Sequence, residues 1–130
     1  MSSLMPFLLV GIGGFIGANA RFVVARLVGA VFETRFPLGT FLINVSGSFL
    51  LGVLGTVVGQ KLFPNSEAMR LAFGVGFLGA FTTFSTFTFE TDALFSDGAW
   101  LTATTNIVAS VFVGLVAVRT GIVLAKTWLM

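Results

Sequence analysis

Four long apolar stretches constrain the fold of this chain more than any other feature. They lie at approximately residues 4–31, 38–59, 66–94 and 99–127. A helix needs about 20 mainly apolar residues to cross a bilayer, and lipid offers no partners for free backbone groups. With 56% hydrophobic and 9% charged residues, the sequence is too apolar for a soluble domain of 130 residues. We therefore predict an all-α integral membrane protein, a single transmembrane domain over residues 1–130 with four helices that contact membrane lipid.

The residue types that the sequence lacks exclude several classes of function. It contains no Cys and no His, which removes disulfides, thiolate chemistry and the commonest ligands of transition metals. Its five Asp and Glu residues lie mostly at span ends and in loops, where a general acid and base are hard to bring together. We predict no enzyme, no organic cofactor and no nucleic-acid partner. The first stretch also lacks the pattern of a signal peptide, so we interpret it as a permanent span.

Basic residues are divided almost evenly between the two predicted ends of the bundle. Toward one end lie four of the seven, Lys61, Arg70, Arg119 and Lys126, and toward the other lie Arg21, Arg26 and Arg35. Because Lys and Arg near span ends determine orientation, so weak a bias favours insertion in both orientations. Two oppositely oriented copies would form an antiparallel dual-topology homodimer with a two-fold axis in the membrane plane. The alternative is that one or two charges still fix a single topology.

Glycine pairs indicate where helices approach each other closely. Gly13-x-x-x-Gly17 and Gly55-x-x-x-Gly59 both fit the small-residue pattern of membrane helix contacts. The pattern is common in apolar helices, so it does not identify the partner helix.

The third helix is predicted to break near its centre. Residues 79–89 read GAFTTFSTFTF, with four Thr and one Ser in eleven residues at the expected depth of the bilayer centre. Three glycines precede or begin this run, at Gly74, Gly76 and Gly79, and each weakens a helix. We expect the break near residues 79–83. Unwound backbone at this depth must lie inside protein or line a cavity, where its free carbonyls can coordinate a cation.

Two other helices carry polar stripes. Residues of the second and fourth helices repeat a polar side chain every four positions, which places each set on one helical face: Thr40, Asn44 and Ser48, then Thr102, Asn106 and Ser110. A stripe of this kind either forms hydrogen bonds between helices or lines a permeation path. The residues alone leave both interpretations open.

Phe84 and Phe87 are three positions apart and would share a face of a regular helix. A phenyl ring has a positive edge, so two rings turned edge-on could favour a small anion without a charge that traps it. Thr83, Ser85 and Thr86 would add neutral hydrogen-bond donors. Simple packing of the rings is the alternative.

Several motifs together resemble the Fluc fluoride channels, also called the CrcB family. The matching residues occur in family order over most of the chain: Gly17-Ala-x-x-Arg21, Gly39-Thr40, Asn44-Val-Ser-Gly47-Ser48-Phe49, Gly52, Gly79-x-x-Thr82-Thr83-Phe84-Ser85-Thr86-Phe87 and Glu90. The resemblance implies a passive, selective fluoride channel of the bacterial inner membrane that exports toxic fluoride. It also implies an antiparallel dual-topology homodimer with two separate pores.

Residue roles carried over from the family are expectations. The fluoride pore would contain Asn44, Phe84, Ser85, Thr86, Phe87 and Ser110, with Thr40, Ser48 and Asn106 as further candidates for its lining. Arg21 would lie in a vestibule, and Glu90 would help ions enter or leave. The backbone carbonyls of Gly79 and Thr82, with their dimer mates, would hold a structural Na⁺.

The fourth helix departs from the family pattern. Some members carry an aromatic hydroxyl where Asn106 aligns, and this chain has no Tyr. One competing function is a small dual-topology, proton-coupled exporter of the multidrug-resistance type, but that mechanism needs a carboxylate in the first helix, which has none. A non-transporting assembly subunit, whose polar stripes only join helices, is the other competitor.

Overall fold

The computed structural model describes residues 2–61 and 63–129, and these form an all-helical bundle. Three uninterrupted helices are α1 (Met5–Val31), α2 (Leu38–Gly59) and α6 (Trp100–Leu129). The segment Ser66–Ser96 combines α3 (Ser66–Met69), the π-helix η1 (Arg70–Leu78), α4 (Gly79–Phe81) and α5 (Phe84–Ser96). Within the described ranges, four helical segments are long and apolar enough to cross a membrane, which confirms the predicted number.

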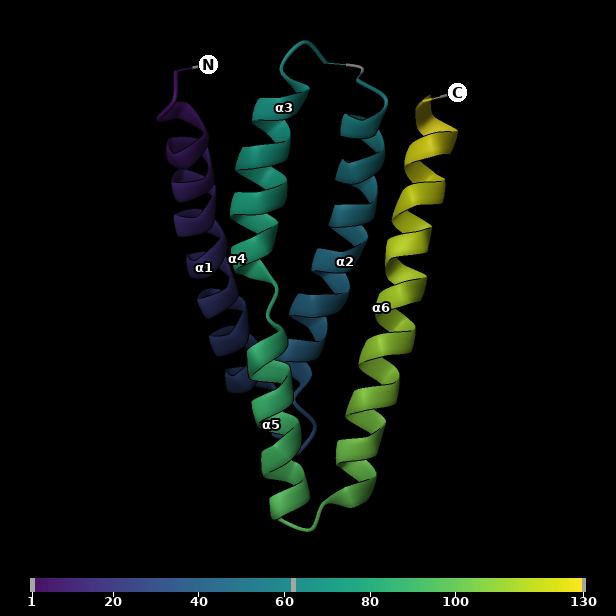
Figure 1. The fold of residues 1–130 in the computed structure, drawn as a ribbon. Coiled ribbons are helices and arrows are strands. Elements are labelled where there is room, and N and C mark those ends of the chain that lie inside the picture. The colour runs from purple at the N-terminus through teal and green to yellow at the C-terminus, as the bar shows by residue number, and fades with distance from the viewer. Residues whose placement is uncertain (1, 62, 130) are drawn as a thin grey trace.

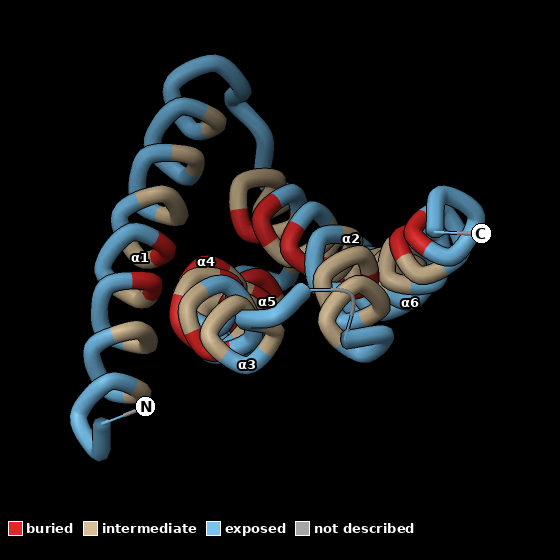
Figure 2. Tube along the Cα trace, turned by 90° about the horizontal axis from the view of Figure 1, so that it is seen from above, coloured by how far each residue is buried: buried red, intermediate tan, exposed pale blue. Residues whose placement is uncertain are grey.

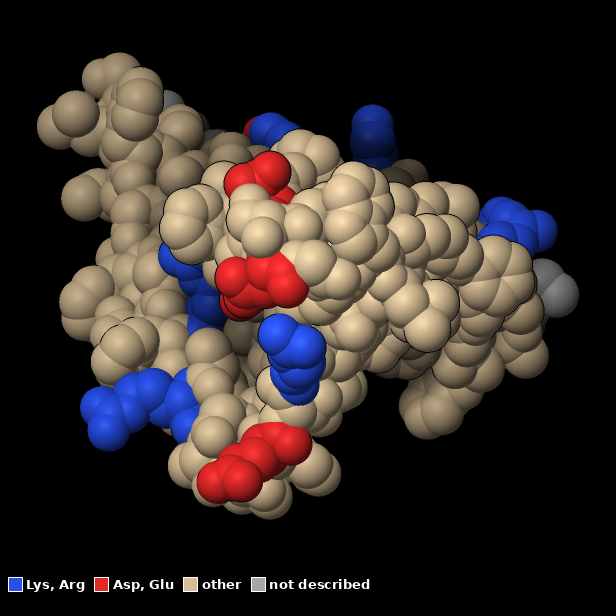
Figure 3. Space-filling view, turned by 90° about the horizontal axis from the view of Figure 1, so that it is seen from below, with Lys and Arg blue, Asp and Glu red and all other residues tan. Residues whose placement is uncertain are grey.

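The four segments alternate in direction along the bundle (Figure 1). Consequently α1 begins and α6 ends at the same end of the molecule, and the α1–α2 loop and the α5–α6 turn lie at the other. Figure 3 looks onto the latter end, where both acidic and basic side chains are exposed. The alternation therefore places the basic residues at two ends of the molecule, as the sequence predicts.

The first helix packs along the upper half of the third segment. A Cβ atom at Gly13 would overlap the carbonyl oxygen of Ala72, and one at Gly17 would overlap that of Phe77. The backbones of α1 and η1 therefore touch at positions where only glycine fits. This contact confirms the interpretation of the first glycine pair.

A different pair of glycines joins α2 to α6. A Cβ atom at Gly52 or at Gly121 would overlap a backbone carbonyl of the facing helix. The predicted pair Gly55 and Gly59 has open space around it within the described chain. The second glycine motif therefore makes no helix contact within the described residues, and its contact with a second chain stays a prediction.

The third segment is interrupted at Thr82 and Thr83. Both residues have extended backbone, with φ and ψ of −80° and 156° at Thr82 and −151° and 118° at Thr83. The predicted break is confirmed and is narrower than expected, since the helix continues through Phe81. The π-helical geometry of Arg70–Leu78 was not predicted.

Most large apolar side chains face outward. Figure 2 shows that the buried positions form narrow stripes where helices meet, and that α1 and α6 are exposed along most of their surface. Ile43 and Asn106 are the largest fully buried side chains of the described residues. An apolar exterior of this extent fits lipid or another protein surface rather than water.

Candidate functional site

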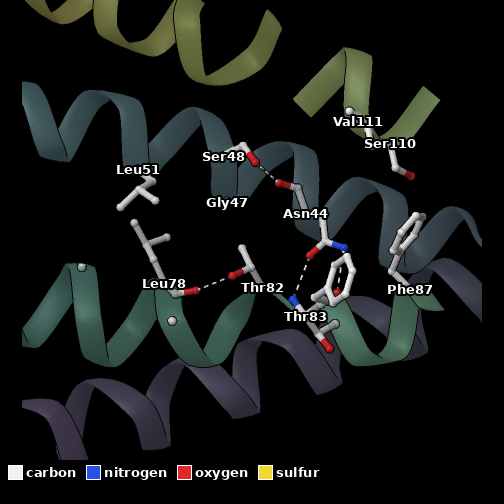
Figure 4. A pocket seen from close by; sticks show the side chains of 13 residues that line it. Asn44, Gly47, Ser48, Leu51, Leu78, Thr82, Thr83, Phe87, Ser110 and Val111 are labelled. Carbon is white, nitrogen blue, oxygen red and sulfur yellow. Dashed lines mark hydrogen bonds between the residues drawn. The ribbon is translucent and has the colours of Figure 1, made fainter. Parts of the chain in front are cut away.

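The break in the third segment is stabilised by one amide side chain. The backbone N–H of Thr83 donates to Oδ1 of Asn44 at 2.8 Å, and Nδ2 of Asn44 donates to the carbonyl oxygen of Thr83 at 3.0 Å (Figure 4). The N–H of an extended residue inside a helical bundle has no strand to pair with and needs such a partner, whereas the carbonyl of Thr83, at the N-cap of α5, also takes the first helical bond. Asn44 bonds to both groups from α2.

Thr83 in turn caps α5. Its hydroxyl oxygen accepts the backbone N–H of Thr86 at 3.2 Å, which is the usual role of a threonine at this position. The same hydroxyl donates to Oγ1 of Thr86 at 3.0 Å and lies 3.5 Å from Oγ of Ser85. The hydroxyls expected beside the phenyl rings therefore form one connected group at the start of the helix.

The bonds from the N–H groups of Thr83 and Thr86 to side chains leave the carbonyl oxygens of Gly79 and Thr82 without their helical partners. In a continuous α-helix each N–H bonds to the carbonyl four residues earlier, so Thr83 would bond to Gly79, and Thr86 would bond to Thr82. Here both N–H groups go to side chains instead. The two carbonyls named from the sequence as cation ligands are thus among those that lose their helical partners at the break.

A cavity of about 350 Å³ lies beside the break, between α2, the third segment and α6 (Figure 4). Its polar lining consists of neutral groups, which come from Asn44, Ser48, Thr82, Thr83 and Ser110. Phe84, Phe87 and several aliphatic residues complete it. Residues that the sequence singled out therefore meet at one cavity: Asn44, Ser48, Gly79, Thr82, Thr83, Phe84, Phe87 and Ser110.

The two phenyl rings stand at the start of α5. Their centroids are 5.8 Å apart, and the ring planes are inclined by 45°. Phe84 is 77% exposed in the single chain, whereas Phe87 is half-buried. Neither ring is enclosed by core packing, so their edges are available to a solute or to a second protein surface.

Thr40 and Glu90 form a separate polar contact nearer the α1–α2 loop. The buried hydroxyl of Thr40 donates to Oε1 of Glu90 at 2.9 Å, while Oε2 is buried without a partner in the described residues. Both side chains line a second cavity, of about 220 Å³. The carboxylate is therefore held by a hydroxyl on α2. Arg21, half-buried on α1, lines neither cavity.

The polar stripe of α6 is divided between the cavity and the helix interface. Ser110 lines the cavity, whereas Asn106 is 1% exposed and lies behind it. Nδ2 of Asn106 donates to the hydroxyl of Thr91 at 2.8 Å, and Oδ1 accepts from Ser110 at 3.1 Å. The sequence reasoning missed Thr91. Its position four residues after Phe87, and so on the same face of α5, was the available signal.

Residues 8–122 match the family described as CrcB-like protein, camphor resistance (CrcB). A relative from Ruminiclostridium cellulolyticum is 41% identical over 98% of this chain and 97% of its own length. One from Nitratiruptor sp. is 43% identical over 90% and 89%, and one from Methylococcus capsulatus is 48% identical over 90% and 51%. All three bear the name fluoride-specific ion channel FluC.

The match includes most of each of the four membrane-spanning segments and all of the break and the cavity beside it. A chain with these spans is a multi-pass membrane protein. Because the family match extends over most of its length, and relatives at 41% identity align from end to end, this chain belongs to the CrcB-like protein family.

Proposed function

We propose that the chain forms a passive channel that exports fluoride across the bacterial inner membrane. The observation that carries the proposal is a cavity at the helix break whose lining holds neutral donors and two phenyl rings but no charged side chain. Ring edges and donors attract a small anion, and the lack of a formal positive charge allows its release. The names of the relatives agree with this chemistry.

The path runs along the groups that meet at this cavity. Asn44, Ser110 and the rings of Phe84 and Phe87 line it, and the hydroxyls of Ser85 and Thr86 adjoin it. At the end that holds the α1–α2 loop, Thr40 and Glu90 border the second cavity, through which the ion passes between the pore and water. Arg21 adds positive charge to a vestibule, which raises the local concentration of anions.

Two copies in antiparallel orientation enclose two such pores. Support for the dimer comes from Phe84, whose ring lines the cavity and is nevertheless 77% exposed in the single chain. A path bounded on one side by lipid could not conduct an ion, so a second protein surface is needed there. The near-even distribution of basic residues supports opposite orientations of the two copies.

A structural Na⁺ lies on the two-fold axis in this proposal. The freed carbonyls of Gly79 and Thr82 fit it because a hard cation takes oxygen ligands and each chain offers two. The ion would link the two breaks and neutralise their carbonyl dipoles. Replacing Na⁺ with the larger cation N-methyl-D-glucamine is expected to shift purified dimer toward monomer in size-exclusion chromatography. An unchanged dimer fraction would contradict the sodium site.

The test of transport uses purified protein in liposomes loaded with fluoride and chloride. Fluoride should leave without a proton gradient while chloride stays inside, and Phe84→Ile or Phe87→Ile should lower the fluoride rate sharply with the dimer intact. Efflux that requires a proton gradient would favour the exporter of the multidrug-resistance type. The absence of Asp and Glu from Met5–Val31 is the sequence feature that argues against that exporter.

A further inference from the structure

A chain of three hydrogen bonds runs behind the cavity from α5 to α6. The hydroxyl of Thr91 donates to the carbonyl oxygen of Phe87 at 2.6 Å, and Nδ2 of Asn106 donates to the hydroxyl of Thr91 at 2.8 Å. The hydroxyl of Ser110 then donates to Oδ1 of Asn106 at 3.1 Å. Thr91 is 6% exposed and Asn106 is 1% exposed, so their bonds are shielded from water and lipid.

The direction of this chain determines what Ser110 presents to the cavity. A serine hydroxyl has one hydrogen and two lone pairs. Because the hydrogen points to Asn106, the side that faces the cavity carries lone pairs. Lone pairs accept hydrogen bonds from water but repel an anion, so an anion at this place needs the hydrogen of Ser110 turned toward it.

The same atoms permit the opposite direction. The nitrogen and oxygen of an amide have nearly the same shape, so a half-turn of the Asn106 side chain exchanges them without a change in packing. Nδ2 would then donate to Ser110, and Thr91 would turn its hydroxyl from the Phe87 carbonyl to Oδ1. The Phe87 carbonyl would still accept the backbone N–H of Thr91, as in any α-helix. Ser110 would be free to donate into the cavity, and the number of hydrogen bonds would stay at three once an anion accepts the last one.

We propose that Thr91 and Asn106 are positioning residues that reverse this hydrogen-bond chain, so that Ser110 changes from acceptor to donor when an anion reaches the cavity. The proposal rests on the proposed function of the cavity as an anion path. Thr91 is essential to the reversed state because its hydroxyl is the donor to Oδ1 of Asn106. In the present direction the same hydroxyl accepts from Nδ2 of Asn106, so without it the buried amide lacks a partner in either direction and no longer holds Ser110.

Thr91→Val and Thr91→Ser test the role of the hydroxyl in fluoride efflux from liposomes. Valine keeps the shape and leaves Asn106 without this partner in both directions, so Ser110 is no longer held toward the anion and efflux should fall about tenfold, the factor expected when one hydrogen bond of typical net strength is lost. Serine keeps the donor, so its rate should stay within about twofold of the unmodified protein. Thr120→Val is the matched control, because the exposed Thr120 bonds only to the Val116 carbonyl of its own helix. If valine at position 91 is not recovered as folded protein, Thr91→Ala removes the same hydroxyl in less space.

A double-mutant comparison separates positioning from packing. Ser110→Ala removes the group through which Thr91 acts, so adding Thr91→Val to it should lower efflux no further. The proposal would be overturned if the double variant showed the product of the two single losses of efflux rate. It would also be overturned if the Thr91→Ser rate were as low as that of Thr91→Val. No efflux through the unmodified protein would refute the proposed function and this inference with it. Normal efflux through Thr91→Val would refute the inference alone.

Discussion

At the scale of single residues, Asn44 is the side chain on which the break in the third segment depends. One amide satisfies both the N–H and the carbonyl of Thr83, and by taking that N–H it also frees the carbonyl of Gly79. A polar side chain on α2 therefore fixes the backbone of a different segment. The position expected to line a pore serves the architecture of the pore as well, because the same amide borders the cavity.

Replacing Asn44 by Ala should therefore lower stability as well as transport. The buried N–H of Thr83 would lose its partner, which costs about 1–3 kcal/mol, while its carbonyl, at the N-cap of α5, keeps the first helical bond. We expect the free energy of unfolding in detergent, measured by circular dichroism, to fall by about 1–3 kcal/mol. Ser48→Ala is the control, because it removes a neighbouring hydroxyl that bonds only to the carbonyl of Asn44 in its own helix. Equal losses in the two variants would contradict the role of Asn44 as a cap.

At the scale of elements, the contact between α1 and η1 sets the position of the break relative to the first helix. A π-helix is wider than an α-helix, and such segments occur often at functional sites. Here α1 lies against the carbonyl side of η1 at Gly13 and Gly17, and a Cβ at Gly76 would in turn crowd the backbone of α1. Three glycines thus allow two helix backbones to touch over more than one turn.

Gly17→Val should disrupt this contact. The new side chain would meet the carbonyl of Phe77, and overpacking of this kind costs about 1–3 kcal/mol. Gly11→Ala on the same helix is the matched control, because nothing lies within 4 Å of a Cβ there and alanine favours the helix by up to about 1 kcal/mol. Thermal unfolding of purified protein should show a lower midpoint for the first variant and an equal or higher one for the second. A lower midpoint for both would mean that helix flexibility, rather than contact, is what glycine provides.

The sequence was sufficient to predict the features that depend on residues close together in the chain. Apolar length indicated the spans, and the glycines with the Thr and Phe run indicated the break. Contacts between different helices were harder to predict, because the spacing of residues along one helix does not show which neighbouring helix they face. This is why the spacing indicated Gly55 and Gly59 although Gly52 makes the contact with α6, and why Asn106 was considered for the pore without its partner Thr91. The π-helix was missed since its composition is that of any glycine-containing span.

In the molecule as a whole, few side chains are buried within the described chain. Its buried positions form thin seams between the helices (Figure 2). The cavity is bordered by the largely exposed ring of Phe84. Lipid can cover apolar helices, but it cannot bond to hydroxyls or carbonyls that line a path. In the proposed channel a second copy supplies the missing surface, and a few basic side chains would set the orientation of that copy.

Shifting the charge balance should abolish function in single variants and restore it in a mixture. Gln60→Lys with Arg35→Gln gives five basic residues against two, and Lys61→Gln with Lys126→Gln and Ser96→Lys gives two against four. Each variant should insert in one orientation because Lys and Arg near span ends stay on the cytoplasmic side. Neither alone can form an antiparallel pair, so each should lack fluoride efflux, whereas cells that express both should regain it. Fluoride efflux through either variant alone, together with crosslinks that join only parallel copies, would establish a parallel assembly instead, since an axis in the membrane plane requires opposite orientations.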